Sequence, residues 1–336
     1  AWLVIAFPEE TILYATMFAA LLKLAVGTVG AMLYLKMFTK RDSWVLLGGV
    51  LYTFSSFSVI NTNFYFFQEV IAFFPYLMYG LECLIQKKKH RLYIGALVIN
   101  AIINFYFFVS TVFLVVFYVV LRLELYRPRG WKNHFAIFLR IALCSILGVG
   151  LAGFALFPSL YAILGSGKAA ASFGNASYIK VFEPADILER LRVLVAPIDS
   201  NTYHSFYNSS SWCSVAAFLP VFGCLFGLHW CRRKRDWLQK LLILLFVCYL
   251  LPIPNSLFNL FTSAHYSRWL YGPVLWIALV TVRSLEDWEE SGKTVSAKCL
   301  AAYILAAAAG RELLGESQVG ATQAVEAFVE DIHSGA

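Results

Sequence analysis

The chain has 336 residues, of which 60% are hydrophobic and only 14% are charged. Soluble domains carry roughly 25% charged residues, so this composition excludes the water-soluble classes and predicts an integral membrane protein. The formal net charge of +7 does not indicate nucleic-acid binding, because the basic residues stand in short segments between apolar runs. That arrangement follows the positive-inside pattern of membrane proteins, and it can also attract anionic membrane lipid.

Apolar runs near the length of a membrane span recur along the chain. They predict an all-α, polytopic transmembrane helix bundle with about nine or ten spans or half-spans. In chain order the runs are 11–35, 44–60, 68–85, 92–121, 135–157, 212–230, 238–253 and 270–285. A weak alanine-rich helix is expected at 297–310, so that the bundle covers 1–310. The polar tail 311–336 is assigned no role.

The stretch 61–91 sets the expected orientation of the bundle. It begins with aromatic residues and Glu69, continues as an apolar helix, and ends in the basic run 87–91. Because helix ends rich in Lys and Arg stay in the cytoplasm, Glu69 is expected at the outer surface. The first residues of the chain then lie outside, and we expect that a further helix precedes them in a longer chain.

The run 92–121 is flanked by basic residues on both sides. Both of its ends are therefore expected in the cytoplasm, which requires an even number of crossings. We predict a hairpin of two short helices that turns at Asn104, Phe105 and Tyr106. A single long tilted helix is the alternative, and it would invert the orientation of every later segment.

The longest polar segment, 158–211, is predicted to be an extracytoplasmic loop that begins where a helix ends at Pro158. Within it, the stretch 184–197 places Leu188, Leu191 and Val195 on one helical face. This pattern suits a helix that lies in the membrane interface. An ordinary surface helix of a small loop domain is the other interpretation.

No nucleotide-binding, phosphate-binding or zinc-binding motif is present, so no metal site is predicted. The candidate site consists instead of polar groups near the outer ends of helices, where a charge is costly and indicates function. Lys23 lies in the middle of the first span, Glu69 opens the third, and Arg268 precedes the last. Amides and aromatic rings expected at the same level are Asn61, Asn63, Asn104, Tyr106, His265, Tyr266 and Trp269.

Each candidate also has a structural interpretation. A carboxylate at a helix N-terminus is stabilising by itself, an arginine can extend to lipid headgroups, and tyrosine and tryptophan form interfacial belts. Headgroup contact is the interpretation adopted for Glu82, Arg140 and Arg283, which stand near predicted cytoplasmic ends.

Three stretches resemble the YfhO-like bacterial membrane proteins: FFQEVIAFFPYLMYGLECLIQKKK, INFYFFVS and NLFTSAHYSRWLYGPVLWIALV. The resemblance covers most of 11–285, and its most specific parts are Glu69, the turn at Asn104 to Tyr106, and the pair Arg268 and Trp269. It implies a GT-C type glycosyltransferase in the bacterial plasma membrane. Such an enzyme transfers a sugar from a polyprenyl-phosphate-linked donor to a cell-envelope polymer, such as a teichoic acid, outside the cytoplasm.

The resemblance further implies an inverting reaction that is independent of metal or weakly assisted by one. No cofactor is therefore expected, and a divalent metal stays open. Two departures stand out: such enzymes usually carry an acidic residue in the first outer loop, upstream of residue 1, and usually continue into further spans and an outer domain.

The predicted site is an outward cavity between the third helix, the hairpin and segment 255–269. Glu69 is expected to act as general base or sugar ligand, Arg268 with His265 to hold the lipid phosphate, and Lys23 to supply a counter-charge. Tyr106 and Trp269 are expected to stack on the sugar, beside the hydrogen-bonding residues Asn61, Asn63, Asn104 and Tyr266.

Expected partners are the polyprenyl-phosphate-sugar, a cell-envelope glycopolymer and membrane lipid, without nucleic acid. A transporter or flippase of lipid-linked sugars and a non-catalytic membrane scaffold are the alternative functions. The transporter predicts a polar path through the bundle, and the scaffold predicts that Glu69 and Arg268 lie apart and face lipid.

Overall fold

The computed structural model of the protein describes residues 8–61, 65–124, 131–165, 187, 190, 223–261 and 267–291. Every regular element within these residues is a helix, which confirms the predicted all-α class. Several predictions lie outside the described residues. They concern 297–310, the tail 311–336, the first part of 212–230, the interfacial helix at 184–197 apart from Ile187 and Arg190, and Asn63, His265 and Tyr266.

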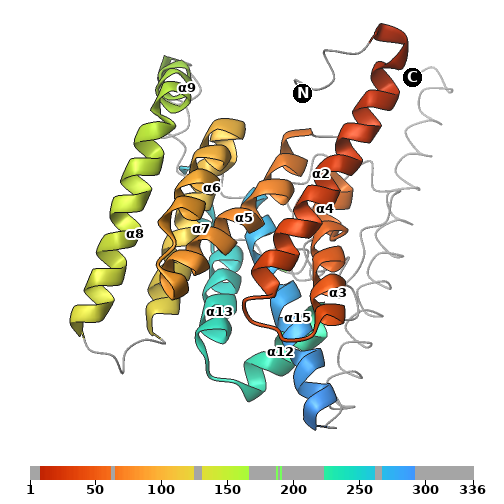
Figure 1. Ribbon diagram of the computed structural model, residues 1–336, viewed down its shortest axis with the longest axis vertical. Coiled ribbons are helices and arrows are strands. Elements are labelled where there is room, and N and C mark those ends of the chain that lie inside the picture. Colours follow the sequence, from red (N-terminus) through yellow and green to blue (C-terminus); the bar gives the residue numbers. More distant parts are fainter. Residues whose placement is uncertain are drawn as a thin grey trace, which may run out of the picture.

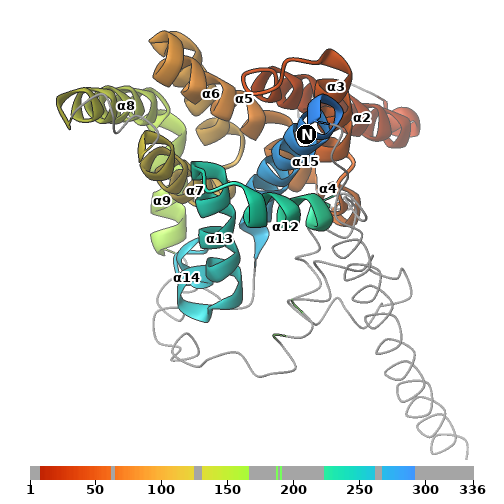
Figure 2. The same ribbon diagram turned by 90° about the horizontal axis from the view of Figure 1, so that it is seen from below.

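The helices form an up-and-down bundle (Figure 1). In chain order they are η1 (Glu9–Thr11), α2 (Ile12–Leu35), α3 (Asp42–Thr53), α4 (Ser56–Ile60), α5 (Tyr65–Lys87), α6 (His90–Ile103), α7 (Phe105–Glu124), α8 (Trp131–Leu151), α9 (Gly153–Gly165), α12 (Gly223–Arg233), α13 (Trp237–Leu250), α14 (Pro252–Leu257), η7 (Arg268–Leu270) and α15 (Tyr271–Ser291). Seen from below, α15 lies among α3, α12 and α13, whereas α8 lies at the edge beyond α6 and α7 (Figure 2).

Three helical segments are long and apolar enough to cross a membrane: α2, the Phe105–Leu123 part of α7 and the His134–Leu151 part of α8. Shorter apolar helices are α6, α13 and the Gly153–Ala162 part of α9. Helices α5 and α15 are as long as a span but also contain charged residues, among them the buried Glu82 and Glu286. The outer faces of α2 and α8 expose Phe18, Leu21 and Ile146, as lipid-facing helices do.

The predicted hairpin is confirmed, and the single long helix is excluded. Helix α6 ends at Ile103, Asn104 is not helical, and α7 begins at Phe105. The Asn104 side chain accepts a hydrogen bond from the backbone N–H of Phe107 at 3.4 Å, so it caps the N-terminus of α7. The turn therefore lies at Asn104, the first of the three residues at which it was predicted.

Two predicted spans are broken in the structure. The run 44–60 forms α3 and α4 with a break at Phe54 and Ser55, and the run 135–157 forms α8 and α9 with a break at Ala152. Glycines at 148, 150 and 153 concentrate near this second break, and glycine weakens a helix interior. Pro158 lies inside α9, so the loop predicted from residue 158 cannot begin before residue 166.

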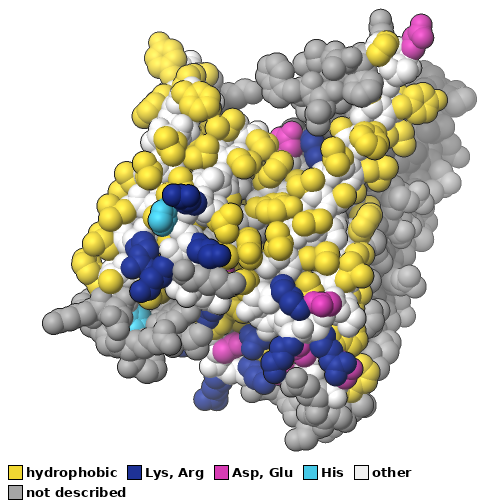
Figure 3. Space-filling model, in the orientation of Figure 1, with side chains coloured by type: hydrophobic (Ala, Val, Ile, Leu, Met, Phe, Trp, Pro, Cys, Tyr) yellow, Lys and Arg dark blue, Asp and Glu magenta, His cyan; other side chains and the backbone are white. Residues whose placement is uncertain are grey.

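Basic residues gather toward one end of the bundle. The α2–α3 turn, the α12–α13 turn and the C-terminal end of α15 lie together in the lower part of Figure 1, and Lys and Arg side chains concentrate over the lower half of the face in Figure 3. The acidic end of α15 meets them there: Glu286 accepts from the backbone N–H groups of Lys40 and Arg41 at 2.8 and 3.2 Å. Lys234 pairs with Asp287 at 2.8 Å.

Candidate functional site

A partly buried ion pair joins α2 to α5. Lys23 Nζ lies 3.2 Å from Glu69 Oε1, and the two side chains are only 17% and 18% exposed. Each charge reduces the cost of placing the other in an apolar environment. The structure thus brings together two of the three charged residues that the sequence singled out.

Close packing of two helices creates this pair. A Cβ atom on Gly27 would lie 2.9 Å from the carbonyl oxygen of Ile71, a separation that real side chains do not adopt. Because Gly27 has no side chain, α2 approaches the backbone of α5. Lys23 lies one turn before Gly27 on the same face of α2, and Glu69 lies two residues before Ile71. The Tyr76 hydroxyl donates to the Val26 carbonyl at 3.0 Å and fixes the same contact.

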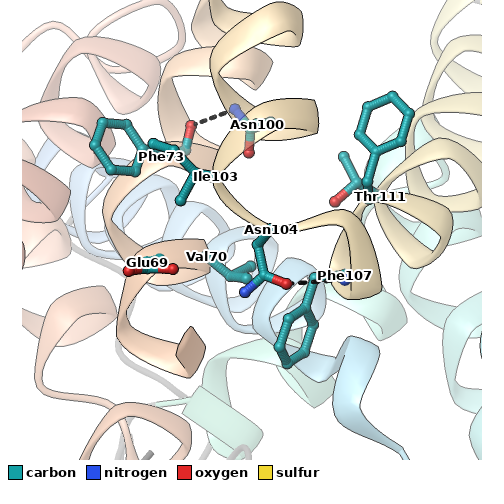
Figure 4. A pocket seen from close by; sticks show the side chains of 9 residues that line it. Glu69, Val70, Phe73, Asn100, Ile103, Asn104, Phe107 and Thr111 are labelled. Atoms are coloured by element: carbon teal, nitrogen blue, oxygen red, sulfur yellow. Dashed lines mark hydrogen bonds between the residues drawn. The ribbon is translucent and has the colours of Figure 1, made fainter. Parts of the chain in front are cut away.

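A small pocket lies next to the carboxylate, between α5 and the α6–α7 hairpin. It is lined by Glu69, Val70, Phe73, Asn100, Ile103, Asn104, Phe107, Phe108 and Thr111. Figure 4 shows the Glu69 carboxylate and the Asn104 amide on the same side of this pocket, with the amide nitrogen turned toward Glu69. The pocket volume of about 10 Å³ admits about one water molecule, so a sugar ring does not fit in this conformation.

Asn100 is a pocket residue that the sequence analysis did not select. Its side-chain amide donates to the carbonyls of Phe73 at 3.1 Å and Ala96 at 2.8 Å, and it thereby ties α6 to α5. An asparagine within the apolar helix α6 was the available signal, because polar residues in membrane helices are costly without such partners.

Arg268 lies beside this pocket and contacts two aromatic rings. Its Nη1 donates to the Tyr106 hydroxyl at 2.9 Å, and its guanidinium carbon lies 5.4 Å from the Tyr106 ring centre and 5.9 Å from that of Phe67. The Phe67 ring packs edge-on against Phe107 at 4.8 Å, and Phe107 lines the Glu69 pocket. The cation and the carboxylate therefore share one end of the bundle, separated by the Phe67–Phe107 contact.

Two predicted sugar-binding residues are buried instead. Trp269 has 0% exposure; its ring stacks on Phe258 with centres 4.1 Å apart, and its N–H donates to Asn255 Oδ1 at 2.8 Å. Asn61 is 1% exposed, and its amide donates to the carbonyl of Phe57 at 2.7 Å. The structure gives both side chains packing roles, so neither offers the exposed surface that the prediction required.

A second ion pair lies at the other end of α5. Glu82, predicted to extend to headgroups, is 0% exposed, and Arg122 on α7 donates to its two oxygens at 2.8 and 3.2 Å. Tyr118 and Gln86 also donate to this carboxylate. That prediction was wrong because sequence position near a helix end does not reveal a partner on another helix. Glu82 lies about 20 Å from Glu69 along α5.

Arg190 was missed as well, since it stood in a polar segment of balanced charge. It is 1% exposed and donates to the Tyr249 carbonyl at 2.9 Å and to Ser267 Oγ at 3.3 Å.

Across the described part of the chain, no three His, Cys, Asp or Glu side chains gather as metal ligands would. That the reaction needs no cofactor stays a prediction, and a divalent metal stays open.

Comparison with known sequences places the chain in a family. No curated protein and no solved structure matches it. The sequence model of the family described as "Bacterial membrane protein YfhO" matches residues 1–317, which include α2, α5, the hairpin and Arg268. Because this match covers far more than half of the chain, the protein belongs to the YfhO family of bacterial membrane proteins.

Proposed function

We propose that this protein binds a polyprenyl-phosphate-linked sugar at the Glu69 end of the bundle and transfers the sugar to a cell-envelope polymer of the teichoic-acid type. The reaction takes place on the extracytoplasmic side of the bacterial plasma membrane. The observation that supports this proposal best is the carboxylate of Glu69, held by Lys23 beside a pocket lined by two amides.

Glu69 acts as the general base in this scheme. An acceptor hydroxyl attacks the anomeric carbon of the donor sugar, the bond from that carbon to the phosphate oxygen breaks, and polyprenyl phosphate leaves. The hydroxyl proton passes to Glu69. Lys23 donates to Oε1 and holds the carboxylate at the pocket where the acceptor hydroxyl would bind.

Arg268 binds the phosphate of the donor and of the leaving group. A guanidinium matches phosphate oxygens with two parallel N–H bonds, and a cation placed where negative charge develops lowers the barrier. Tyr106, which is 44% exposed, shares a hydrogen bond with Arg268 and offers the sugar a ring face.

Donor binding requires the hairpin to move away from α5, because the pocket admits about one water molecule. The backbone at Asn104 is not helical, with φ −147°, so a change of angle there shifts the start of α7 without unwinding either helix. Lid and loop movements of this kind accompany substrate binding in many enzymes.

A transporter of lipid-linked sugars receives less support from the described residues. Between Glu69 and Glu82, the buried side chains of α5 are apolar: Val70, Ile71, Ala72, Phe74, Leu77, Met78 and Leu81. On α5, the polar groups at the two ends are thus separated by apolar side chains, whereas a transport path along this helix would need to connect them.

The test is sugar transfer by the Glu69→Gln variant in isolated membranes. Labelled polyprenyl-phosphate hexoses serve as donors and lipoteichoic acid serves as acceptor. Gln keeps the shape of Glu but cannot accept the proton, so transfer should fall by about 10²–10⁴-fold. Glu289→Gln, which changes an exposed carboxylate near the basic end, should transfer as the wild type does. Wild-type transfer by Glu69→Gln would refute the proposed base.

A further inference from the structure

Arg190 is a buried cation that contacts Ser267, the residue before Arg268, and it has no part in the proposed mechanism. Arg190 Nη1 donates to the Tyr249 carbonyl near the C-terminus of α13 and to the Ser267 hydroxyl. Its guanidinium carbon lies 5.1 Å from the Tyr249 ring centre, and the Tyr249 hydroxyl donates to the Arg190 carbonyl at 3.3 Å. With 1% exposure, the guanidinium cannot itself reach a lipid phosphate in this conformation.

The residues on both sides of Arg268 are fixed to one acceptor. Ser267 donates to Asn255 Oδ1 at 3.0 Å, and the indole N–H of Trp269 donates to the same oxygen at 2.8 Å. Asn255 belongs to α14, and all three side chains have 0% exposure. The backbone that carries Arg268 is therefore held at residues 267 and 269, while the Arg268 side chain points away from this buried group to Tyr106.

Arg190 completes this arrangement from a different part of the chain. Its hydrogen bond to Ser267 and its bond to the Tyr249 carbonyl connect the 158–211 segment, helix α13 and η7 at one point. Supporting residues of this kind hold a ligand-binding side chain in its productive geometry.

We propose that Arg190 is a positioning residue for Arg268. It holds Ser267 and the start of η7 in place, so that the Arg268 guanidinium is directed toward Tyr106 and the donor phosphate. The identity of the anion rests on the proposed function, whereas the coupling between Arg190 and Arg268 rests on the hydrogen bonds alone.

The coupling is tested without any ligand by hydrogen exchange on the full chain in lipid nanodiscs. In Arg190→Gln, the amides of residues 268–271 should exchange about tenfold faster than in the wild type, because a charge-assisted hydrogen bond is lost. Arg190→Lys keeps the charge and should show a smaller increase. Arg122→Lys is the matched control. It changes another buried arginine, which is on α7 and pairs with Glu82, and the exchange rates of amides 268–271 should stay as in the wild type. Wild-type exchange in both Arg190 variants would overturn the proposal.

A second measurement uses polyprenyl phosphate without a sugar as the probe. Arg190→Lys should bind it about tenfold more weakly, and Arg122→Lys should bind it as the wild type does. In an Arg268→Ala background, Arg190→Lys should not weaken binding further, because the effects of two substitutions that act through one group do not add.

An equal loss of affinity in both backgrounds would show that Arg190 acts independently and would overturn the positioning role. Unchanged binding by Arg268→Ala alone would instead refute the phosphate contact of the proposed function, and hydrogen exchange would still decide the coupling.

Discussion

Lys23 and Glu69 each place a charge on a helix whose neighbours are mainly apolar. Their separation of 3.2 Å and their low exposure indicate that each depends on the other. Removal of one partner leaves an uncompensated charge in a partly buried site, whereas removal of both leaves a neutral contact. The pair is therefore a structural contact, and it also holds the carboxylate that we propose as the general base.

A double-mutant cycle measures this dependence. Lys23→Met and Glu69→Gln should each destabilise the protein, and the double variant should lose less than the sum, with a coupling of about 1–2 kcal/mol. Unfolding in mixed detergent micelles gives the four free energies of unfolding.

The exposed pair Lys36 and Asp42, with side chains 49% and 88% exposed, is the matched control. Its coupling should be near zero, because exposed ion pairs contribute little. Additive effects at Lys23 and Glu69 would show that their contact does not stabilise the bundle.

The sequence identified these charged residues but not all of their neighbours. A lysine within an apolar run is visible without a structure, and so is a glutamate at the start of one. The packing of Trp269 on Phe258 is not, because an interfacial, a ligand-binding and a buried tryptophan share the same sequence pattern. Arg190 was equally hidden, since its partners Tyr249 and Ser267 lie about 60 to 80 residues away.

At the scale of the elements, glycine positions decide how closely helices pack. Gly27 allows α2 to approach α5, and this approach places Lys23 against Glu69. The sequence predicted both helices and the hairpin from apolar runs and basic flanks. It did not predict the breaks at Ser55 and Ala152, because the apolar run continues through Ala152, and the small hydroxyl residues near Ser55 do not by themselves end a membrane helix.

Gly27→Ala tests the close approach. The added Cβ would lie 2.9 Å from the Ile71 carbonyl oxygen, so the helices must separate, at a cost of about 1–3 kcal/mol. Sugar transfer should fall as the ion pair lengthens.

Gly95→Ala on α6 is the control, because a Cβ there meets nothing within 4 Å. It should keep full transfer and gain up to about 1 kcal/mol from better helix propensity. Equal effects of the two substitutions on stability and transfer would contradict the role of helix spacing.

At the scale of the whole molecule, α5 contributes a carboxylate to one ion pair toward each of its ends. Glu82 with Arg122 is enclosed and fully satisfied, whereas Glu69 with Lys23 adjoins a pocket. The acidic end of α15 is bound by Lys40, Arg41 and Lys234. Among the described residues, the basic end is thus closed by ion pairs and hydrogen bonds, whereas the Glu69 end carries a small pocket.

The central claim is that the Glu69 end faces the outside of the cell. Its most direct test is labelling of single cysteines by a membrane-impermeant maleimide in intact cells, in a background without the native cysteines. Tyr106→Cys reports the Glu69 end, and Lys89→Cys, at an exposed position between α5 and α6, reports the basic end. We predict that Tyr106→Cys is labelled in intact cells and Lys89→Cys only after permeabilisation; labelling of Lys89→Cys in intact cells with Tyr106→Cys protected would contradict the account.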